Sequence, residues 1–532
     1  MVLQSLPVLI TSGDLLPGGG ELNGRRWAGQ QLLRCWARQA GSRPMALAHA
    51  VPAQLEQLKP WLKCQGFTGE LHPLGLLDPE PCRAWGGFFL PDPSIGRWAQ
   101  WRQPVGSAAF SLIGQIHTLS TPAALGHLQD LVTEPVQPWD ALICSSRAGR
   151  DAVEQVLDAR EEQLQWRTGA SPALLRSQRP HLPVIPLPLP PESLEPFKFS
   201  KLQARKSLGI APGHPVVLWL GRLSLLTKTD PWPTYLVLER VARELRRPVV
   251  FIECGPDDKP SPHEDLENLR RLCPSVRFLR LGGAEPVSEE VKRQALAAAD
   301  VAVSLVDNAQ ETFGLAVAEA MAAGLPLVAS DWSGYRDLVR DGVDGFLIPS
   351  AWATSASRVS VPLGWQQFTG IQGFPAVAGA LAQLVQLDLL KAEMALLTVL
   401  SQPSMARAMG AAAARRAREL FAPELVMAAH EKLFAELEQR RCQAPPDAHC
   451  PRPVSPQLDP VRVFARFASH TSESIPARSE TLQCLPPAVR QQRALIWQIL
   501  AESLPNSERG QMESDLVCKH QQLDCVEQVA TP

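Results

Sequence analysis

The sequence predicts an α/β protein with two doubly wound halves, each a mainly parallel sheet covered by helices. Short apolar runs rich in β-branched residues alternate with helical stretches along the 532-residue chain, as expected of strands buried on both faces. A proline-rich stretch at residues 184–191, which suits neither a helix nor a central strand, separates the two halves. The apolar content of 45% is sufficient for the cores of two or three domains.

The first half, residues 1–190, opens with a predicted strand at residues 7–11. The turn after this strand holds Gly19 and Gly20, and it would let backbone N–H groups approach a phosphate closely. A tight loop without a ligand would show the same pattern. Ser146 precedes a helical stretch at residues 148–165, as an N-cap residue does. Further strands are expected at residues 45–49, 88–90, 110–118 and 141–145.

The second half, residues 191–400, repeats this alternation. Its strands are expected at residues 216–220, 249–253, 276–281, 301–306 and 327–330. Its helices are expected near residues 235–246, 287–298, 315–323 and 379–400, the last as a single amphipathic helix. Residues 401–442 are rich in Ala, Arg and Glu and strongly helical by propensity. Residues 443–532 begin as a proline-rich linker and continue into a tail to which the sequence assigns no role.

The composition excludes several classes of function. A net charge of −2, from 52 basic and 54 acidic residues, argues against a dedicated nucleic-acid surface. The eleven cysteines form no C-x-x-C pair and no Cys/His cluster at zinc-ligand spacing, which indicates free thiols in a reducing compartment and no metal site. The N-terminus lacks the basic region of a signal peptide, and no apolar run reaches the roughly 18 residues of a membrane span. We therefore expect a cytoplasmic protein without a transmembrane segment.

Two glutamates mark the strongest candidate site. Glu311 lies in the turn after the predicted strand at residues 301–306, and Glu319 lies about two turns along the helix that follows. The N–H groups at the start of that helix favour a bound phosphate. This arrangement suits a diphosphate flanked by two acceptors for sugar hydroxyls. The alternative is an ordinary βαβ unit with two surface glutamates.

Three further side chains follow predicted strands. Gly221 and Arg222 come directly after the strand at residues 216–220, and Lys228 comes six residues later. A basic pair at the carboxyl end of a strand can neutralise a diphosphate, although two surface cations would look the same. His117 lies at the end of the strand at residues 110–118, where it can bind a substrate hydroxyl or be a satisfied core histidine.

Residues 311–346 resemble the donor-binding signature of the retaining glycosyltransferases of family 4, the group 1 glycosyltransferases, which have the GT-B fold. The resemblance rests on five elements in order: Glu311-x7-Glu319, Phe313-Gly314, Glu319-Ala320, Gly324-x-Pro326 and Asp344-Gly345-Phe346. It implies two Rossmann-like domains facing across a cleft, the acceptor side first and the nucleotide-sugar side second. It also implies that residues 401–442 are closing helices that return to the first domain.

The resemblance assigns roles to the candidate residues. Arg222 and Lys228 would stabilise the departing diphosphate, Glu311 would bind the hexose, and His117 would contact the transferred sugar or position the acceptor; these four are the expected catalytic residues. Neither glutamate is expected to act as a nucleophile. The remaining residues expected to bind the donor, through the ribose or through backbone groups, are Glu319, Phe313, Gly314, Thr312, Gly221, Gly19 and Gly20.

The function that the resemblance implies is retaining transfer of a hexosyl group to a glycan, lipid or small-molecule acceptor. The donor would be a UDP- or GDP-linked sugar, and no cofactor is expected. The chain contains no Asp-x-Asp pair, which disfavours a metal-dependent transferase of the GT-A type. Two alternatives remain: a catalytically silent GT-B binding or scaffold subunit, and a GT-B sugar-nucleotide epimerase. Contact with a membrane surface is left open.

Overall fold

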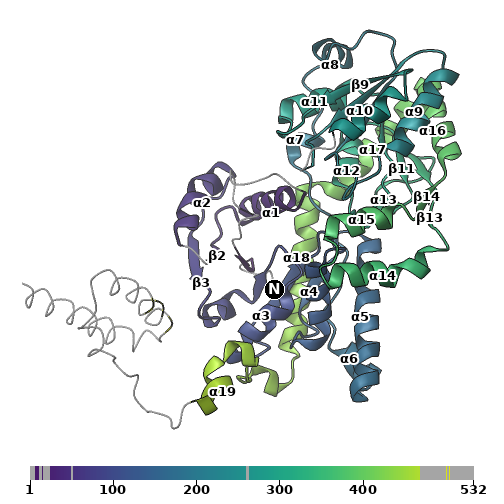
Figure 1. Cartoon of the computed structure of the whole chain (residues 1–532). Helices are drawn as coiled ribbons and strands as arrows, with labels where there is room; N and C mark the ends of the chain where they lie inside the picture. The colour runs from purple at the N-terminus through teal and green to yellow at the C-terminus, as the bar shows by residue number, and fades with distance from the viewer. Residues whose placement is uncertain are drawn as a thin grey trace, which may run out of the picture. The chain divides into compact units, whose positions relative to one another are not determined.

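The computed structural model describes residues 6–10, 15, 24–49, 52–258, 263–467, 496, 499 and 503. The chain divides into two compact units, Met1–Pro453 and Val454–Pro532. The first unit holds two six-stranded parallel sheets and the helices that cover them (Figure 1). Gly19 and Gly20 lie outside the described residues, so the predicted glycine-rich turn stays a prediction.

The first sheet has the strand order β3-β2-β1-β4-β5-β6. Its strands are β1 Val8–Ile10, β2 Met45–His49, β3 Leu71–Gly75, β4 Gly87–Phe89, β5 Ser111–Gln115 and β6 Ala141–Ile143. The helices of this half are α1 Gly24–Ala40, α2 Pro52–Cys64, α3 Ile95–Arg102, α4 Pro122–Thr133, α5 Arg147–Thr168 and α6 Pro172–Ser177. The sequence did not predict β3, because this edge strand is only partly buried and contains Pro73, which interrupts the apolar pattern.

The second sheet has the strand order β12-β11-β10-β7-β8-β9. Its strands are β7 Val216–Leu220, β8 Val249–Cys254, β9 Val276–Leu281, β10 Val301–Ser304, β11 Leu327–Ser330 and β12 Gly345–Ile348. The helices of this half are α7 Pro191–Leu194, α8 Lys201–Ser207, α9 Trp232–Glu244, α10 His263–Arg271, α11 Glu289–Ala298, α12 Leu315–Ala322 and α13 Tyr335–Leu338. The predicted doubly wound α/β architecture is confirmed in both halves.

The strand order of the second sheet reverses between β7 and β10, which are neighbours although two strands separate them in sequence. Such a switch point opens a crevice beyond the carboxyl ends of the strands, where open α/β sheets bind ligands. Buried apolar residues cover both faces of this sheet, among them Val216 and Leu218 on one face and Val217 and Trp219 on the other. This packing fixes the positions of the strand ends.

The chain after β12 differs from the prediction at one place. Residues 379–400 do not form one helix, because helix α15 (Phe374–Ala382) ends and strand β14 (Val385–Leu387) pairs with β13 (Ser350–Trp352) before α16 (Leu389–Ser401) begins. The Asp388 carboxylate accepts a hydrogen bond from the N–H of Lys391 and caps α16. The apolar residues continue through this cap and this strand, so their pattern suggested one helix instead of two helices and a strand. Helix α14 spans Ala356–Phe368.

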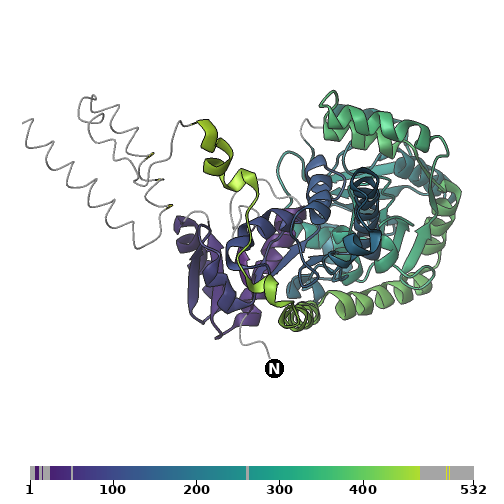
Figure 2. The same ribbon diagram turned by 90° about the horizontal axis from the view of Figure 1, so that it is seen from below.

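Two long helices, α17 (Pro403–Phe421) and α18 (Pro423–Cys442), follow α16. Helix α17 packs on α12 of the second half, and α18 packs on α1 of the first. The rings of Trp36 in α1 and Phe434 in α18 lie 5.7 Å apart in the core of the first half. Figure 2 shows α18 end-on beside the purple and blue elements of the first sheet. The second unit contains α19 (Pro460–Phe464).

Within the part of the chain that the structure describes, no helix has the length and apolar character needed to cross a bilayer.

Candidate functional site

The candidate site lies where β7, β8, β10 and β11 end. A tight backbone contact brings the first two of these ends together: the N–H of Gly221 donates to the carbonyl of Cys254 at 2.9 Å. Gly255 has φ 153°, and a Cβ there would lie 2.0 Å from the carbonyl oxygen of Gly221. Only glycine fits such an approach. The loops that carry the predicted cations therefore run directly against the end of β8.

The structure brings together two of the predicted site residues, Lys228 and Glu311. The Lys228 Nζ lies 2.5 Å from Glu311 Oε2, with the two side chains 24% and 10% exposed. Two hydrogen bonds hold the loop of Lys228 against the segment after β10: Thr229 Oγ1 donates to the carbonyl of Leu305 at 2.9 Å, and Asn308 Nδ2 donates to that of Leu226 at 2.9 Å. A cation and a carboxylate are thus presented at one edge of the sheet.

Tyr335 was missed by the sequence reasoning. Its hydroxyl lies 3.5 Å from Glu311 Oε2 and 2.8 Å from Ser304 Oγ, and its side chain is fully buried. Burial raises the pKa of Tyr335 well above its ordinary value, so the hydroxyl keeps its proton as a donor. The available signal was that Tyr335 is one of two tyrosines in the chain and follows the predicted strand at residues 327–330.

The turn after Glu311 requires glycine. Gly314 has φ 102°, and a Cβ there would lie 2.5 Å from the ring of Tyr335. Gly314 is also the N-cap residue of α12, so the backbone of Thr312, Phe313 and Gly314 leads into the helix N-terminus, as predicted. The ring of Phe313 is buried against Phe421 of α17, with centroids 5.7 Å apart. The contribution of Phe313 to a ligand is therefore restricted to its backbone.

Glu319 of α12 faces Lys292 of α11, with Nζ and Oε1 2.8 Å apart. The Lys292 side chain also lies 2.8 Å from Glu289. Burial raises the pKa of Glu319, and the charge of Lys292 opposes that shift. The sequence did not single out Lys292, because a lysine in an amphipathic helix resembles a solvated surface residue.

Arg222 pairs with a carboxylate on the loop after β8. Its Nη1 lies 2.8 Å from Asp258 Oδ1, and its Nη2 donates to Thr227 Oγ1 at 3.1 Å. The Asp258 carboxylate also accepts from Ser224 Oγ. Arg222 and Lys228 thus each have a carboxylate of their own, and the side chain of Arg222 stays 38% exposed. Asp258 was missed because it follows the Gly255-Pro256 turn without a recognisable motif.

The first half contributes largely through backbone atoms and a helix cap. Thr312 Oγ1 donates to the carbonyl of His117 at 2.5 Å, while the ring Nε2 of His117 lies 2.9 Å from the carbonyl of Pro91. Ser146, the N-cap residue of α5, donates its Oγ–H to the carbonyl of Thr312 at 2.6 Å. Arg147 Nε lies 2.5 Å from Asp337 Oδ1. The turn before α12 is therefore contacted directly from the first half.

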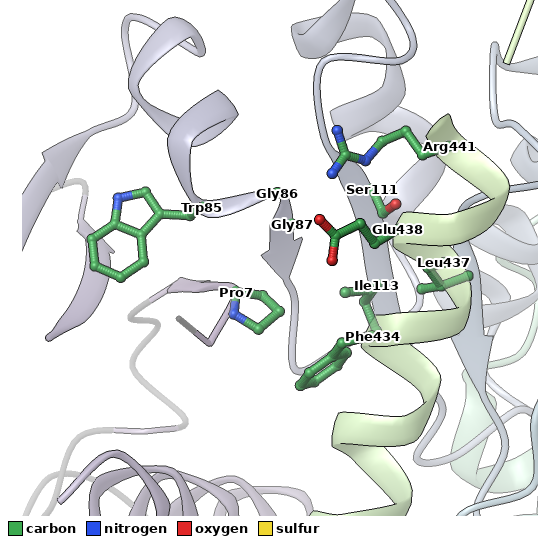
Figure 3. A pocket seen from close by; sticks show the side chains of 10 residues that line it. All are labelled: Pro7, Trp85, Gly86, Gly87, Ser111, Ile113, Phe434, Leu437, Glu438 and Arg441. Atoms are coloured by element: carbon green, nitrogen blue, oxygen red, sulfur yellow. The ribbon is translucent and has the colours of Figure 1, made fainter. Parts of the chain in front are cut away.

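A separate pocket lies at the amino ends of strands in the first sheet. Its lining includes Gly87 and Ser111, the first residues of β4 and β5, together with Glu438 and Arg441 of α18 (Figure 3). His117, by contrast, follows the carboxyl end of β5. The pocket is therefore not part of the candidate site. Among the described residues, no three His, Cys, Asp or Glu side chains are grouped as metal ligands would be.

Comparison with known proteins supports the interpretation of the second half. Residues 214–360 match the family model "Glycosyl transferases group 1". The chain is 34% identical to a D-inositol 3-phosphate glycosyltransferase of Actinosynnema mirum over 175 residues, which is 31% of this chain and 40% of that protein. It is 29% identical to the Nocardia farcinica protein of the same name over 293 residues, which is 53% of this chain and 58% of that protein. The chain thus spans about half the length of these curated relatives.

A solved structure shares the fold. The crystal structure of Anabaena Alr3699/HepE in complex with UDP aligns with a TM-score of 0.50 and 16% identity, over 81% of this chain and all of that chain. Together with the family match, this similarity confirms the predicted GT-B architecture and the predicted resemblance to the group 1 glycosyltransferases.

Proposed function

We propose that this chain, with its GT-B fold and its group 1 glycosyltransferase match, is a retaining hexosyltransferase. It would transfer a hexosyl group from a UDP- or GDP-linked sugar to a glycan, lipid or small-molecule acceptor. The observation that carries the proposal is the Lys228–Glu311 pair, 2.5 Å apart at the carboxyl edge of the second sheet and beside the N-terminus of α12. This edge is where open α/β sheets bind nucleotides.

The proposed chemistry is electrostatic. As the bond between the sugar C1 and the diphosphate oxygen breaks, negative charge develops on the diphosphate, and Lys228 and Arg222 stabilise it together with the N–H groups of the turn before α12. Glu311 accepts hydrogen bonds from hexose hydroxyls, and Tyr335 and Lys228 orient its carboxylate. The acceptor hydroxyl forms its bond to C1 on the face that the diphosphate leaves, and its proton passes to the departing diphosphate oxygen. No protein side chain serves as the nucleophile in this scheme.

The roles of the other site residues are also part of this proposal. His117 would position the acceptor or the transferred sugar, Glu319 would bind the ribose, and Gly19, Gly20 and Gly221 would place backbone groups near the donor. Two cations and a helix N-terminus supply positive charge for the diphosphate without a metal ion, which supports metal-independent transfer. The names of the two relatives make D-inositol 3-phosphate the first acceptor to test. The enzyme would act in the cytoplasm, free or at a membrane surface.

The test is nucleotide release from a panel of UDP-, GDP- and ADP-sugars, with and without acceptor extracts or D-inositol 3-phosphate. We expect release that persists in EDTA in the wild type and is lost in Glu319→Ala. Glu290→Gln, an exposed change in the first turn of α11, is the matched control and should behave as the wild type. If no donor binds and none is released, the enzyme proposal fails and the scaffold alternative replaces it. Release that requires a divalent cation would contradict metal independence alone.

A further inference from the structure

Lys292 of α11 and Glu319 of α12 form a buried ion pair next to the nucleotide edge of the second sheet. The two side chains are 15% and 9% exposed, and Nζ lies 2.8 Å from Oε1. Lys292 lies near the start of α11, which follows the carboxyl end of β9, and Glu319 lies in α12, which follows the carboxyl end of β10. A lysine and a glutamate on different helices are thus held together where the loops of the candidate site begin.

The charge state of this pair depends on both partners. Burial alone lowers the pKa of Lys292, but Glu319 and Glu289 together raise it above its ordinary value, so Lys292 is charged at neutral pH. Burial raises the pKa of Glu319, and Lys292 is the first group that opposes this shift. Without Lys292, the Glu319 carboxyl would take up a proton more readily. A protonated carboxyl accepts fewer hydrogen bonds than a carboxylate.

The burial of this pair calls for an explanation besides stability. Replacing a buried ion pair by apolar residues is often neutral or stabilising, so such pairs are weak stabilising elements. Charges retained in a buried position at a ligand-binding edge are more typical of functional sites. A second ion pair of the same domain, between Lys201 and Asp300, is more exposed and lies at the amino end of β10. Its charged atoms are 2.9 Å apart, and its side chains are 47% and 31% exposed.

We infer that Lys292 is a positioning residue for ribose recognition, which it controls by holding Glu319 as an oriented carboxylate. This inference rests on the proposed function, in which Glu319 accepts hydrogen bonds from the ribose. Lys292 holds Oε1 of Glu319 from the α11 side at 2.8 Å, and this anchor restricts the orientations of the carboxylate. A vicinal diol then meets an ionised acceptor in one orientation. Lys292 itself does not touch the nucleotide; it acts through Glu319.

The test is calorimetric binding of UDP, or of GDP if the donor panel selects guanine, compared with its 2′-deoxy and 3′-deoxy forms. We expect the wild type to prefer the ribonucleotide and Lys292→Met to lose that preference by about tenfold or more, the effect of one hydrogen bond to a charged group. Lys292→Arg, which keeps the cation, should restore most of the preference. Lys201→Met is the matched control and should keep the wild-type preference.

A double-mutant cycle separates positioning from direct contact and from a merely structural role. On a Glu319→Gln background, Lys292→Met should not change the ribonucleotide preference further. The double variant leaves no unpaired charge buried between the two helices. The comparison can therefore be made even if the single variant Lys292→Met does not fold. An additional loss in the double variant would overturn the inference, as would an unchanged preference in folded Lys292→Met. If neither UDP nor GDP binds the wild type, the proposed function fails. This result differs from a failure of the Lys292 inference, in which the wild type still binds the nucleotide.

Discussion

The carboxyl edges of the two sheets are built differently. In the second half, charged side chains form the edge: Lys228 pairs with Glu311, and Arg222 pairs with Asp258. In the first half, the carbonyl of His117 and the capping hydroxyl of Ser146 contact the turn before α12. The comparison teaches that charged residues at a motif's spacing can be recognised in a sequence, whereas the contacts that backbone atoms and caps make with the other half cannot.

The largest effect is expected from the charged pair. Lys228→Met should lower kcat by about 100- to 1000-fold, the usual cost of removing one group that stabilises developing charge. His117→Ala should lower it by only about tenfold, because alanine keeps the backbone carbonyl that accepts from Thr312. Steady-state kinetics with the donor from the panel provide the measurement. Equal losses in the two variants would show that side-chain chemistry is shared between the halves.

The glycine before α12 allows a second comparison. Gly314→Ala should cost on the order of 3 kcal/mol of unfolding free energy, since it combines a left-handed φ with a Cβ that would lie only 2.5 Å from the Tyr335 ring. Gly66 in the first half has φ 94° and open space around a Cβ. Gly66→Ala should therefore cost only about 1 kcal/mol. Urea unfolding measures both, and equal costs would mean that the overlap with Tyr335 is relieved cheaply.

The two halves also differ in how each holds a buried aspartate. In the first half, both oxygens of Asp140 accept hydrogen bonds from Arg102, at 2.6 and 2.8 Å. In the second half, burial raises the pKa of Asp307 to about 7 and the charge of Asp230 adds to the shift. The folded-state pKa of Asp307 exceeds its ordinary value of 3.8, so the folded state binds the proton more tightly. The contribution of Asp307 to stability is thus complete below about pH 4 and lost as the pH rises to about 7.

Asp307→Asn should remove this loss and raise the unfolding free energy at pH 8 by on the order of 2 kcal/mol relative to wild type, with little change at pH 4. Asp140→Asn should instead lower the unfolding free energy at pH 8 by on the order of 3 kcal/mol, because Arg102 is left buried without its counter-charge. Denaturant unfolding at pH 4 to 8 distinguishes the two. A pH profile of Asp307→Asn identical to that of the wild type would contradict the prediction.

Elements with a clear local pattern could be predicted from the sequence, whereas residues whose roles depend on tertiary contacts could not. Strands such as β7 and β11 were predicted to the residue, because apolar runs buried on both faces carry a clear pattern. The single helix predicted at residues 379–400 was wrong, since its apolar run conceals a helix end and the short strand β14. Lys292 and Tyr335 were missed because their importance arises from tertiary neighbours, and a helix surface or a turn gives no sequence signal for those contacts.

The smallest effect is expected at the contact between the halves. Ser146→Ala removes both the N-cap of α5 and the hydroxyl that donates to the carbonyl of Thr312, whereas Thr121→Ala removes only the N-cap of α4. Both should cost about 1 kcal/mol of stability, the usual value of an N-cap. Ser146→Ala alone should also lower kcat/KM, by about five- to tenfold, the effect of one hydrogen bond. If Thr121→Ala lowers kcat/KM equally, the loss reflects general destabilisation. If neither variant changes it, the contribution of the first half lies elsewhere than in this hydroxyl.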